Sequence, residues 1–249
     1  MVDHISVTIL TRDSQKYLDQ CLSALSVFDE IVVLDNGSSD ETLSIAAGYP
    51  NVTIVRHEFI GFGPLKNLAI EHARHDWVLS IDSDEIATPE LVEAIRRLNP
   101  SDSQAVYSVP RANHYNGRPI RCCGWHPDRV WRLFNRQHTR FSDHMVHESL
   151  LLHPSTRCIA LSAGLNHFPF DSAEGLIEKM QKYSTLYAQQ SSKGSTPAKA
   201  FFRALFAFVR NYFFQKGFLY GYEGLLISLS NANGVFYKYI KLYEKTQKR

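Results

Sequence analysis

Asp82 and Asp84 stand two positions apart, directly after a short apolar run at residues 77–81, and their carboxylates are well suited to chemistry. On an extended backbone, side chains two positions apart point to the same side, which predicts that the two carboxylates converge. A divalent cation such as Mg²⁺ or Mn²⁺ takes oxygen ligands and keeps positions open for phosphate oxygens. The pair therefore predicts a metal site that binds a diphosphate. The alternative is an acidic loop that precedes a helix.

Two more polar clusters follow apolar runs in the same way. Thr11-Arg12-Asp13 follows residues 5–10, and Asp35-Asn36-Gly37 follows residues 31–34. In open parallel sheets, ligands bind beyond the carboxyl ends of the strands, so we expect the three clusters at one edge of one sheet. Asp35 is suited to accept a hydrogen bond from a ribose hydroxyl or a base N–H. Its alternative role is to cap the turn that follows.

Lys66 is a candidate for binding an anion. It follows Gly61-Phe62-Gly63-Pro64 at the start of a helical pattern. Glycines let the backbone approach a ligand closely, and a helix start with a lysine favours an anion. A solvated surface lysine is the alternative. The patterns Gly-x-x-x-x-Gly-Lys-Ser/Thr and Gly-x-Gly-x-x-Gly are both missing, which argues against the nucleotide sites that depend on them.

The elements that must hold these residues alternate between strand and helix over the first hundred positions. Short β-branched apolar runs predict buried strands at residues 5–10, 31–34, 52–55 and 77–81. Helices are expected after a cap at Ser14, after Ser38 or Ser39, over residues 65–73, and from Thr88-Pro89-Glu90. This order predicts an α/β fold with a Rossmann-like, mostly parallel central sheet and flanking helices.

After residue 100 the pattern changes. Strands are expected at residues 105–109 and 129–134, and a long helix from Asp171 to about Gln190. We expect one catalytic domain at residues 1–192 and a helical extension at residues 193–249. Residues 199–249 contain 9 Lys and Arg against 2 Asp and Glu, and 14 of these 51 residues are Phe or Tyr. Such a tail predicts contact with an anionic surface such as phospholipid, and helical packing with a solvated rim is the alternative.

Composition limits the remaining classes of protein. The 4 cysteines include no Cys-x-x-Cys pair, which argues against a disulfide framework and a thiolate zinc site. Residues 1–4 lack the basic and apolar segments of a signal peptide. No stretch approaches the length of uninterrupted apolar residues that a membrane span needs. The protein is therefore expected to be cytoplasmic and to rest on a membrane without crossing it.

These motifs together resemble the family 2 glycosyltransferases. The matching segments are residues 5–11, residues 33–42, Lys66-Asn67 and Asp82-Ser83-Asp84-Glu85. The resemblance implies a GT-A fold, a nucleotide-diphosphate sugar as donor, a divalent metal, and inversion at the anomeric carbon. The later pattern is similar to that of bacterial lipopolysaccharide inner-core glucosyltransferases. It consists of His147-Glu148, Asn166-His167 and the region from Gly217 to Gly224.

The resemblance also implies roles for individual residues. Thr11 and Asp35 would hold the uridine, and Asn36 stands where the family often has a second aspartate. The nucleotide-sugar set that it implies is Thr11, Arg12, Asp35, Lys66, Asp82, Ser83, Arg129 and Arg132. The metal set is Asp84, Asp82 and His167, with Asp84 on the diphosphate-bound ion and Asp82 on ribose or metal-bound water. For His167, a buried hydrogen-bonded imidazole is the alternative.

An inverting transfer needs a carboxylate that takes the proton of the acceptor hydroxyl. The candidates in the second half of the chain are Asp128, Asp143 and Glu148. Correspondence with the family favours Glu148, with Asp143 as the fallback, and a surface glutamate is the alternative reading of Glu148. Arg129 or Arg132, together with the metal, would stabilise the leaving diphosphate.

The function that the resemblance implies is a metal-dependent transfer of glucose from UDP-glucose to a sugar of the lipopolysaccharide core. The expected partners are a UDP-sugar, the core or another lipid-linked acceptor, and the cytoplasmic face of the inner membrane, with no nucleic acid. Three alternatives stay open. They are transfer to a polyprenyl phosphate, polysaccharide or protein; nucleotidyl transfer, which lacks its glycine-rich loop here; and a non-catalytic sugar- or lipid-binding module, against which the Asp82, Asp84 and Asp35 carboxylates argue.

Overall fold

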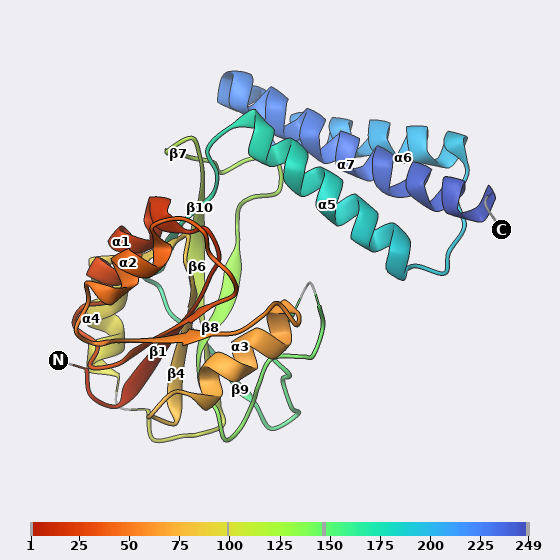
Figure 1. Ribbon diagram of the computed structural model, residues 1–249. Coiled ribbons are helices and arrows are strands. Elements are labelled where there is room, and N and C mark those ends of the chain that lie inside the picture. Colours follow the sequence, from red (N-terminus) through yellow and green to blue (C-terminus); the bar gives the residue numbers. More distant parts are fainter. Residues whose placement is uncertain (1, 99, 146–147, 248–249) are drawn as a thin grey trace. The chain divides into compact units, whose positions relative to one another are not determined.

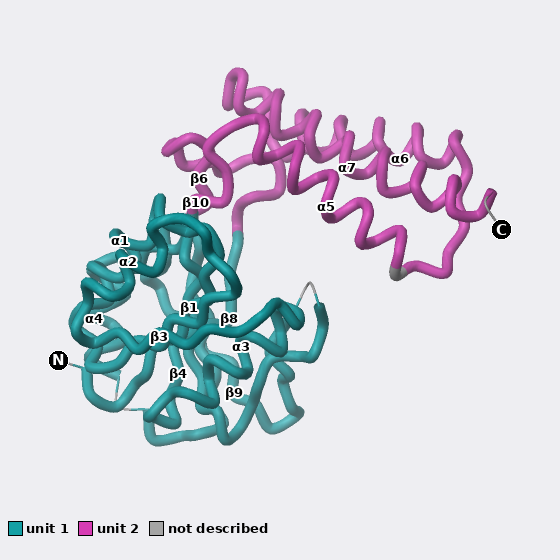
Figure 2. The backbone as a smooth tube through the Cα atoms, viewed as in Figure 1, with its two compact units in different colours: residues 1–111, 128–167 teal, residues 112–127, 168–249 magenta. Residues whose placement is uncertain are grey.

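The computed structural model describes residues 2–98, 100–145 and 148–247. These residues form two compact units, which we call unit 1 and unit 2 (Figure 2). Unit 1 consists of residues 1–111 and 128–167, and unit 2 consists of residues 112–127 and 168–249. The chain passes between them within strands, because β6 (Ala105–Tyr115) and β10 (Leu165–Phe170) each have residues in both units.

A mixed sheet forms the middle of unit 1 (Figure 1). Its parallel half has the order β3 (Val52–Arg56), β2 (Ile31–Asp35), β1 (Ile5–Thr11) and β4 (Trp77–Asp82). The order continues with β8 (Arg129–Asn135), β6, β10 and β5 (Glu85–Ala87), while β9 (Arg157–Ala160) pairs with β6. The register sets Thr11 opposite Asp35 and Leu10 opposite Asp82. The polar residues that follow these strands therefore share one edge of the sheet.

Helices cover both faces of the parallel strands (Figure 1). One face packs against α1 (Gln15–Ala24), α2 (Thr42–Ala47) and α4 (Pro89–Arg97), and the other packs against α3 (Phe62–Glu71). Alternate residues of a strand point to opposite faces. Thus Val33 of β2 belongs to the first core, while its neighbour Leu34 packs on Leu65 of α3. Burial on both faces explains why these strands are almost uninterrupted apolar runs.

Unit 2 is mainly helical. It contains β7 (Arg118–Pro119) and the helices α5 (Ala173–Gln190), α6 (Pro197–Val209) and α7 (Gly221–Gln247). α7 packs against both other helices (Figure 1). A π-helical turn, η1 (Arg210–Phe214), and a 3-10 turn, η2 (Gly217–Tyr220), join α6 to α7. Among the helices in the described part of the chain, none is long and apolar enough to cross a lipid bilayer.

The predicted α/β architecture, with a mostly parallel central sheet, flanking helices and a C-terminal helical region, is confirmed. Thr88 caps α4 as expected, because its side chain accepts from the Leu91 N–H. Ser14 occupies the cap position of α1, but its hydroxyl makes no cap hydrogen bond and lies 2.9 Å from Ser83 Oγ instead. The domain boundary at residue 192 stays a prediction; by its packing on α7, α5 belongs to unit 2.

Candidate active site

Lys66 and Asp82 meet at the carboxyl edge of the parallel strands. Lys66 Nζ lies 2.9 Å from Asp82 Oδ1 and 2.9 Å from Glu148 Oε1. The same ammonium faces the ring of Phe141, 5.1 Å from its centroid. Lysine is rarely buried unless it is paired, and Lys66 is only 6% exposed. The structure thus brings together three residues that the sequence analysis assigned, from α3, β4 and the segment after β8.

A second buried cation, Arg132 of β8, contacts the same carboxylate. Arg132 Nη2 donates to Asp82 Oδ2 and to Glu85 Oε1. Glu85 is fully buried and also accepts from Arg111 Nη1, at 3.1 Å, and Arg111 Nε donates to Asp128 Oδ2, at 2.8 Å. The result is one chain of alternating charges. In order, its members are Glu148, Lys66, Asp82, Arg132, Glu85, Arg111 and Asp128.

This network fixes the charges of its members. Burial by itself raises the pKa of Asp82, but the cations of Arg132 and Lys66 outweigh burial and hold that pKa far below its usual range. Burial by itself lowers the pKa of Lys66, yet Asp82 and Glu148 keep it above its ordinary value despite repulsion from Arg132. Both groups are therefore charged at neutral pH. Within the described residues, Arg132 Nε is buried and makes no hydrogen bond, so it is a spare donor beside Asp82.

The start of α3 holds the segment that carries Glu148. Phe62 N and Gly63 N donate to the carbonyls of Met145 and His144, at 3.1 and 3.2 Å. One turn later, the Asn67 side-chain amide makes two hydrogen bonds with the backbone of Phe141. It donates to the Phe141 carbonyl and accepts from the Phe141 N–H, both at 2.9 Å. These bonds position the chain on either side of Ser142 against α3. They explain why Lys66, on the same helix, reaches Glu148.

Replacing Gly63 with alanine is expected to lower the free energy of unfolding by about 1–3 kcal/mol, the usual range for overpacking. A Cβ at Gly63 would lie 1.9 Å from the Ser142 carbonyl oxygen, so the backbone around Ser142 must move away from α3. Chemical denaturation measures the change. Gly175→Ala in α5 is the matched control, because its Cβ would find no atom closer than 3.7 Å. Equal stability of the two variants would contradict the packing described here.

Asp84 lies outside the network and faces a histidine. The chain turns at Ser83 and Asp84 before β5 begins, so the extended geometry expected for Asp82 and Asp84 is wrong, and the two carboxylates have different neighbours. β10 pairs antiparallel with β5 and sets His167 opposite Glu85. This pairing brings His167 Nε2 to 3.4 Å from Asp84 Oδ2. The turn and the strand pairing together create an Asp–His pair at the edge of the sheet.

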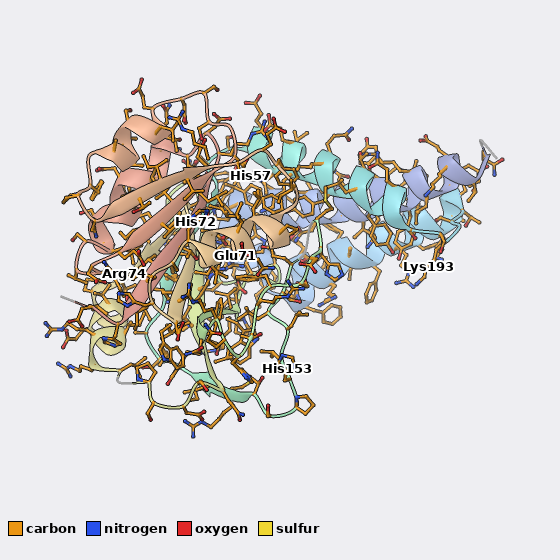
Figure 3. The ribbon with its side chains drawn as sticks, turned by 60° about the horizontal axis from the view of Figure 1, so that its bottom comes forward. His57, Glu71, His72, Arg74, His153 and Lys193 are labelled. Atoms are coloured by element: carbon orange, nitrogen blue, oxygen red, sulfur yellow. The ribbon has the colours of Figure 1, made fainter. Side chains whose placement is uncertain are left out.

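The Asp84–His167 pair has the chemistry of a partial metal site. The Asp84 side chain is 38% exposed, while His167 is nearly buried, so one ligand is accessible and the other is held firmly. Within the residues described, no group of three or more His, Cys, Asp and Glu side chains is arranged to hold an ion. His57, His72 and His153, labelled in Figure 3, are exposed. An ion at Asp84 and His167 would therefore take its other ligands from substrate oxygens and water.

Asp35 organises the loop that follows β2. Its carboxylate accepts from Thr11 Oγ1 at 3.1 Å, from Gly37 N at 3.1 Å, from Ser38 N at 3.0 Å and from Ser38 Oγ. The next residue, Asn36, is buried, and within the described residues its Oδ1 makes no hydrogen bond. Asp35 therefore acts as the turn cap that was the alternative at the sequence level. Asn36 is left with an acceptor for a ligand N–H.

Asp35 is expected to make the stability of the protein depend on pH. Burial by itself raises its pKa, but the hydrogen bonds from Ser38, Gly37 and Thr11 outweigh burial and lower it. Because the pKa of Asp35 is lower in the folded than in the unfolded state, its ionised form stabilises the fold at any pH above the unfolded pKa of about 4. This stabilisation is lost as the pH falls through the folded-state pKa. Urea unfolding of wild type and Asp35→Asn should therefore differ most at neutral pH and converge in acid. A difference that is independent of pH would contradict this account.

Other residues from the sequence analysis lie outside the charge network. Arg129 donates to the carbonyls of Ser108 and Leu161, at 2.9 and 2.7 Å. Arg132 contacts the carboxylates of Asp82 and Glu85 instead, so the two arginines have different partners. The fallback base Asp143 is exposed and pairs with Arg140 at 3.0 Å. Arg12 is exposed, and Ser83 contacts Ser14. His147 lies outside the described residues, and the assigned roles of the others stay predictions.

Sequence reasoning missed two members of the network, Glu85 and Arg111. Glu85 stands in the acidic motif and is the one glutamate of unit 1 that is fully buried in the described structure. Its position after a turn, at the start of β5, gives no local sign of burial. Arg111 lies in the last part of β6, which the sequence analysis ended at residue 109. Strand boundaries are poorly marked in sequence, so this arginine had no predicted element to place it.

The charge network and the Asp84–His167 pair lie at the edge of the sheet where α/β folds bind ligands, and comparison with known families identifies the class of protein. Residues 6–147, which are more than half of the chain, match the model described as glycosyl transferase family 2. The chain belongs to this family. The match includes the parallel strands, α3 and the acidic motif.

Individual relatives match along nearly the whole chain. The lipopolysaccharide core biosynthesis glycosyltransferase LpsC of Rhizobium meliloti is 28% identical over 262 residues, which cover 97% of this chain and 92% of LpsC. The uncharacterized glycosyltransferase RT0209 of Rickettsia typhi is 26% identical, and the match covers 98% of this chain and 88% of RT0209. Among solved structures, S. aureus TarS 1–349 in complex with UDP-GlcNAc superposes with a TM-score of 0.47 at 17% identity, covering 98% of this chain and 92% of that chain. The two sequence relatives include both units.

Proposed function

We propose that this glycosyltransferase transfers a hexose from a UDP-sugar, UDP-glucose in the first place, to a sugar of a lipopolysaccharide core, with inversion at the anomeric carbon. The observation that carries the proposal is the meeting of two buried cations, Lys66 and Arg132, at Asp82 on the edge of the parallel sheet. Preorganised cations in a water-poor site stabilise charge that develops on a leaving diphosphate. Similarity to LpsC over 97% of the chain supports a core sugar as acceptor.

The uridine is assigned to the loop shaped by Asp35. Asp35 already accepts four hydrogen bonds, and its role is to hold the loop in the conformation that a nucleoside requires. The buried Asn36 Oδ1, which lacks a partner among the described residues, matches the N–H that a uracil ring presents. Thr11 fixes Asp35 from the neighbouring strand. Asn36 stands where the family often has an aspartate, and it offers a neutral acceptor on a side chain of the same length.

Asp84 and His167 are the residues proposed to hold a divalent cation, Mg²⁺ or Mn²⁺. His167 Nε2 lies 3.4 Å from Asp84 Oδ2, and the Asp84 carboxylate is partly exposed. Both features suit an ion that would also take oxygen ligands from the donor. Such an ion supplies neutralisation of the charge on the diphosphate. Asp82 is occupied by two cations, so its proposed role is to orient Lys66 and Arg132 rather than to ligate metal.

Glu148 is the proposed base. The acceptor hydroxyl gives its proton to Glu148 while its oxygen forms a bond to C1 of the sugar. On the opposite face of C1, the bond to the diphosphate oxygen breaks, and its electron pair leaves with the diphosphate. Lys66, which donates to Glu148 at 2.9 Å, finds a more highly charged partner in the bound diphosphate. When Lys66 pairs with the diphosphate instead of Glu148, the Glu148 carboxylate becomes free to accept the proton.

A transfer assay tests this proposal. The purified protein is incubated with one UDP-sugar at a time and with lipopolysaccharide truncated in the core, and the products are examined by mass spectrometry and NMR. We expect the acceptor to gain one hexose from UDP-glucose and the new linkage to be β, since the donor is α-linked to its diphosphate. Transfer with retention would contradict the mechanism. Transfer only to acceptors without a core sugar would contradict the proposed acceptor.

A further inference from the structure

Unit 2 exposes large apolar side chains along one continuous stretch of sequence. α6 contributes Phe201, Phe202, Leu205 and Phe206, and the exposed residues continue through η1 and η2 into the first turns of α7. Phe206 is 64% exposed and Phe214 of η1 is 79% exposed. Single exposed apolar residues are ordinary, but so many within one segment are typical of a surface that a partner or a membrane covers. We call the exposed apolar residues of this segment the apolar face.

A cavity of about 280 Å³ lies between α6 and α7, next to this face. Arg203, Arg210 and Lys238 line it, together with Asn211 and Asn231. Arg203 and Arg210 are seven positions apart, which is two helical turns, so they share one stripe of the helix. Phe206, which stands between them, lines the cavity and also belongs to the apolar face. The cationic cavity and the apolar face are therefore adjacent parts of one surface.

Two of the three cations of this cavity lie over aromatic rings, and none of the three is neutralised by a carboxylate among the described residues. Lys238 Nζ lies 3.6 Å from the centroid of the Tyr187 ring, and the Arg203 guanidinium lies 5.9 Å from that of Tyr239. Over the described part of unit 2, Arg118 pairs with Glu223, at 2.9 Å, whereas Arg203, Arg210 and Lys238 pair with no carboxylate. Aromatic rings orient a cation and leave its charge available. The cavity therefore suits an anion.

Two other lysines of α7, unlike the cations of the cavity, donate hydrogen bonds to α5 and the residue that follows it. Lys241 Nζ donates to the side chains of Ser184 and Thr185, both at 2.8 Å, and Lys245 Nζ donates to three carbonyls around the end of α5, at 2.9 to 3.0 Å. These two ammonium groups hold α5 against α7. Lys241 and Lys245 therefore serve helix packing, whereas Arg203, Arg210 and Lys238 line the α6–α7 cavity.

The positive charge of this surface favours an anionic bilayer over a second copy of the protein as its partner. Residues 199–249 contain 9 Lys and Arg against 2 Asp and Glu. In a twofold dimer the same patch would face itself, and the unpaired cations of both copies would repel each other. An anionic phospholipid bilayer offers phosphate to the cavity and acyl chains to the aromatic residues, and it attracts the basic segment as a whole.

We propose that unit 2 binds the surface of an anionic phospholipid bilayer, with a lipid phosphate in the α6–α7 cavity and the apolar face in the acyl boundary. This goes beyond the proposed sugar transfer, because it uses none of the residues assigned to the donor or to the acceptor proton. Its test is therefore independent of whether that assignment is correct.

Flotation with vesicles of phosphatidylcholine, with and without phosphatidylglycerol, tests the proposal. Wild type should float with the phosphatidylglycerol vesicles, and salt should weaken the binding. The Arg203→Gln/Arg210→Gln variant should bind about 30-fold more weakly, at roughly 1 kcal/mol for each charge near the surface. Phe202→Ser/Phe206→Ser should bind more weakly as well. Arg96→Gln/Arg97→Gln, which removes two exposed arginines from α4 of unit 1, is the matched control and should bind like wild type.

Three outcomes would overturn the proposal. They are equal binding to neutral and anionic vesicles, binding that is unchanged in the Arg203/Arg210 variant, and no vesicle binding by a protein that light scattering shows to be a dimer through these phenylalanines. All four substituted positions of unit 2 are exposed, so the variants should fold. Chemical denaturation of the same preparations verifies this, and it separates loss of lipid binding from loss of folding.

Discussion

Replacing Glu148 with glutamine is expected to lower the rate of sugar transfer by about 10²- to 10⁴-fold, which is the usual contribution of a positioned general base. Glutamine keeps the length of the side chain and can still accept from Lys66, which lies 2.9 Å from the carboxylate in wild type. It cannot take a proton from the acceptor hydroxyl at neutral pH. The affinity for UDP should therefore change little while kcat falls. Steady-state kinetics with both substrates saturating, together with titration of UDP, separate the two effects.

Asp143 provides the matched control, since it is the fallback base and lies in the same segment. Its carboxylate is exposed and pairs with Arg140 at 3.0 Å, away from Lys66 and Asp82. Asp143→Asn should keep the transfer rate of wild type. Loss of transfer in Asp143→Asn, with activity retained in Glu148→Gln, would show that the base assignment is wrong.

Replacing Asp84 with alanine is expected to weaken the binding of Mn²⁺ to the UDP complex by at least about 100-fold, since even residues that only support metal ligands contribute 10- to 100-fold. Asp84 is the exposed member of the pair with His167, and without its carboxylate a single imidazole faces the diphosphate. The network around Asp82 does not include Asp84, so stability should be retained. Titration of Mn²⁺ in the presence of UDP measures the loss.

Asp3→Ala controls for the removal of a surface charge, because the Asp3 side chain is 81% exposed and lies far along the chain from the acidic motif. It should bind Mn²⁺ and UDP like wild type. If Asp84→Ala also binds them like wild type, the metal site is elsewhere, and Asp82 becomes the residue to test next.

The sequence was sufficient to predict the edge of the sheet on which the site lies. Parallel strands end at one edge, so Thr11, Asp35 and Asp82 had to come close once the strands were recognised, and the register confirms this. The start of α3 was likewise marked by its glycines, and Lys66 lies at this edge as expected. These predictions needed only the period of the strands and their order along the chain.

The partners of the charged residues could not be predicted, because they depend on contacts between distant segments. Arg132 reaches Asp82, 50 positions earlier, through the antiparallel pairing of β8 with β4, which no local pattern announces. His167 reaches Asp84 only because β10 pairs with the three residues of β5. The turn at Ser83 also redirected Asp84, where the sequence suggested a continued strand. Such pairings are set by the packing of the whole unit rather than by propensity.

Titration of UDP-glucose into the wild-type protein, with and without Mn²⁺, tests the central claim most directly. The account predicts saturable binding that requires the ion and that UDP alone can displace, because Asp84 and His167 would hold the ion, and the ion would neutralise charge on the diphosphate beside Lys66 and Arg132. No binding of UDP-glucose or UDP under either condition would contradict the assignment of this edge of the sheet as a UDP-sugar site. Binding of equal strength without the ion would contradict the role given to Asp84 and His167.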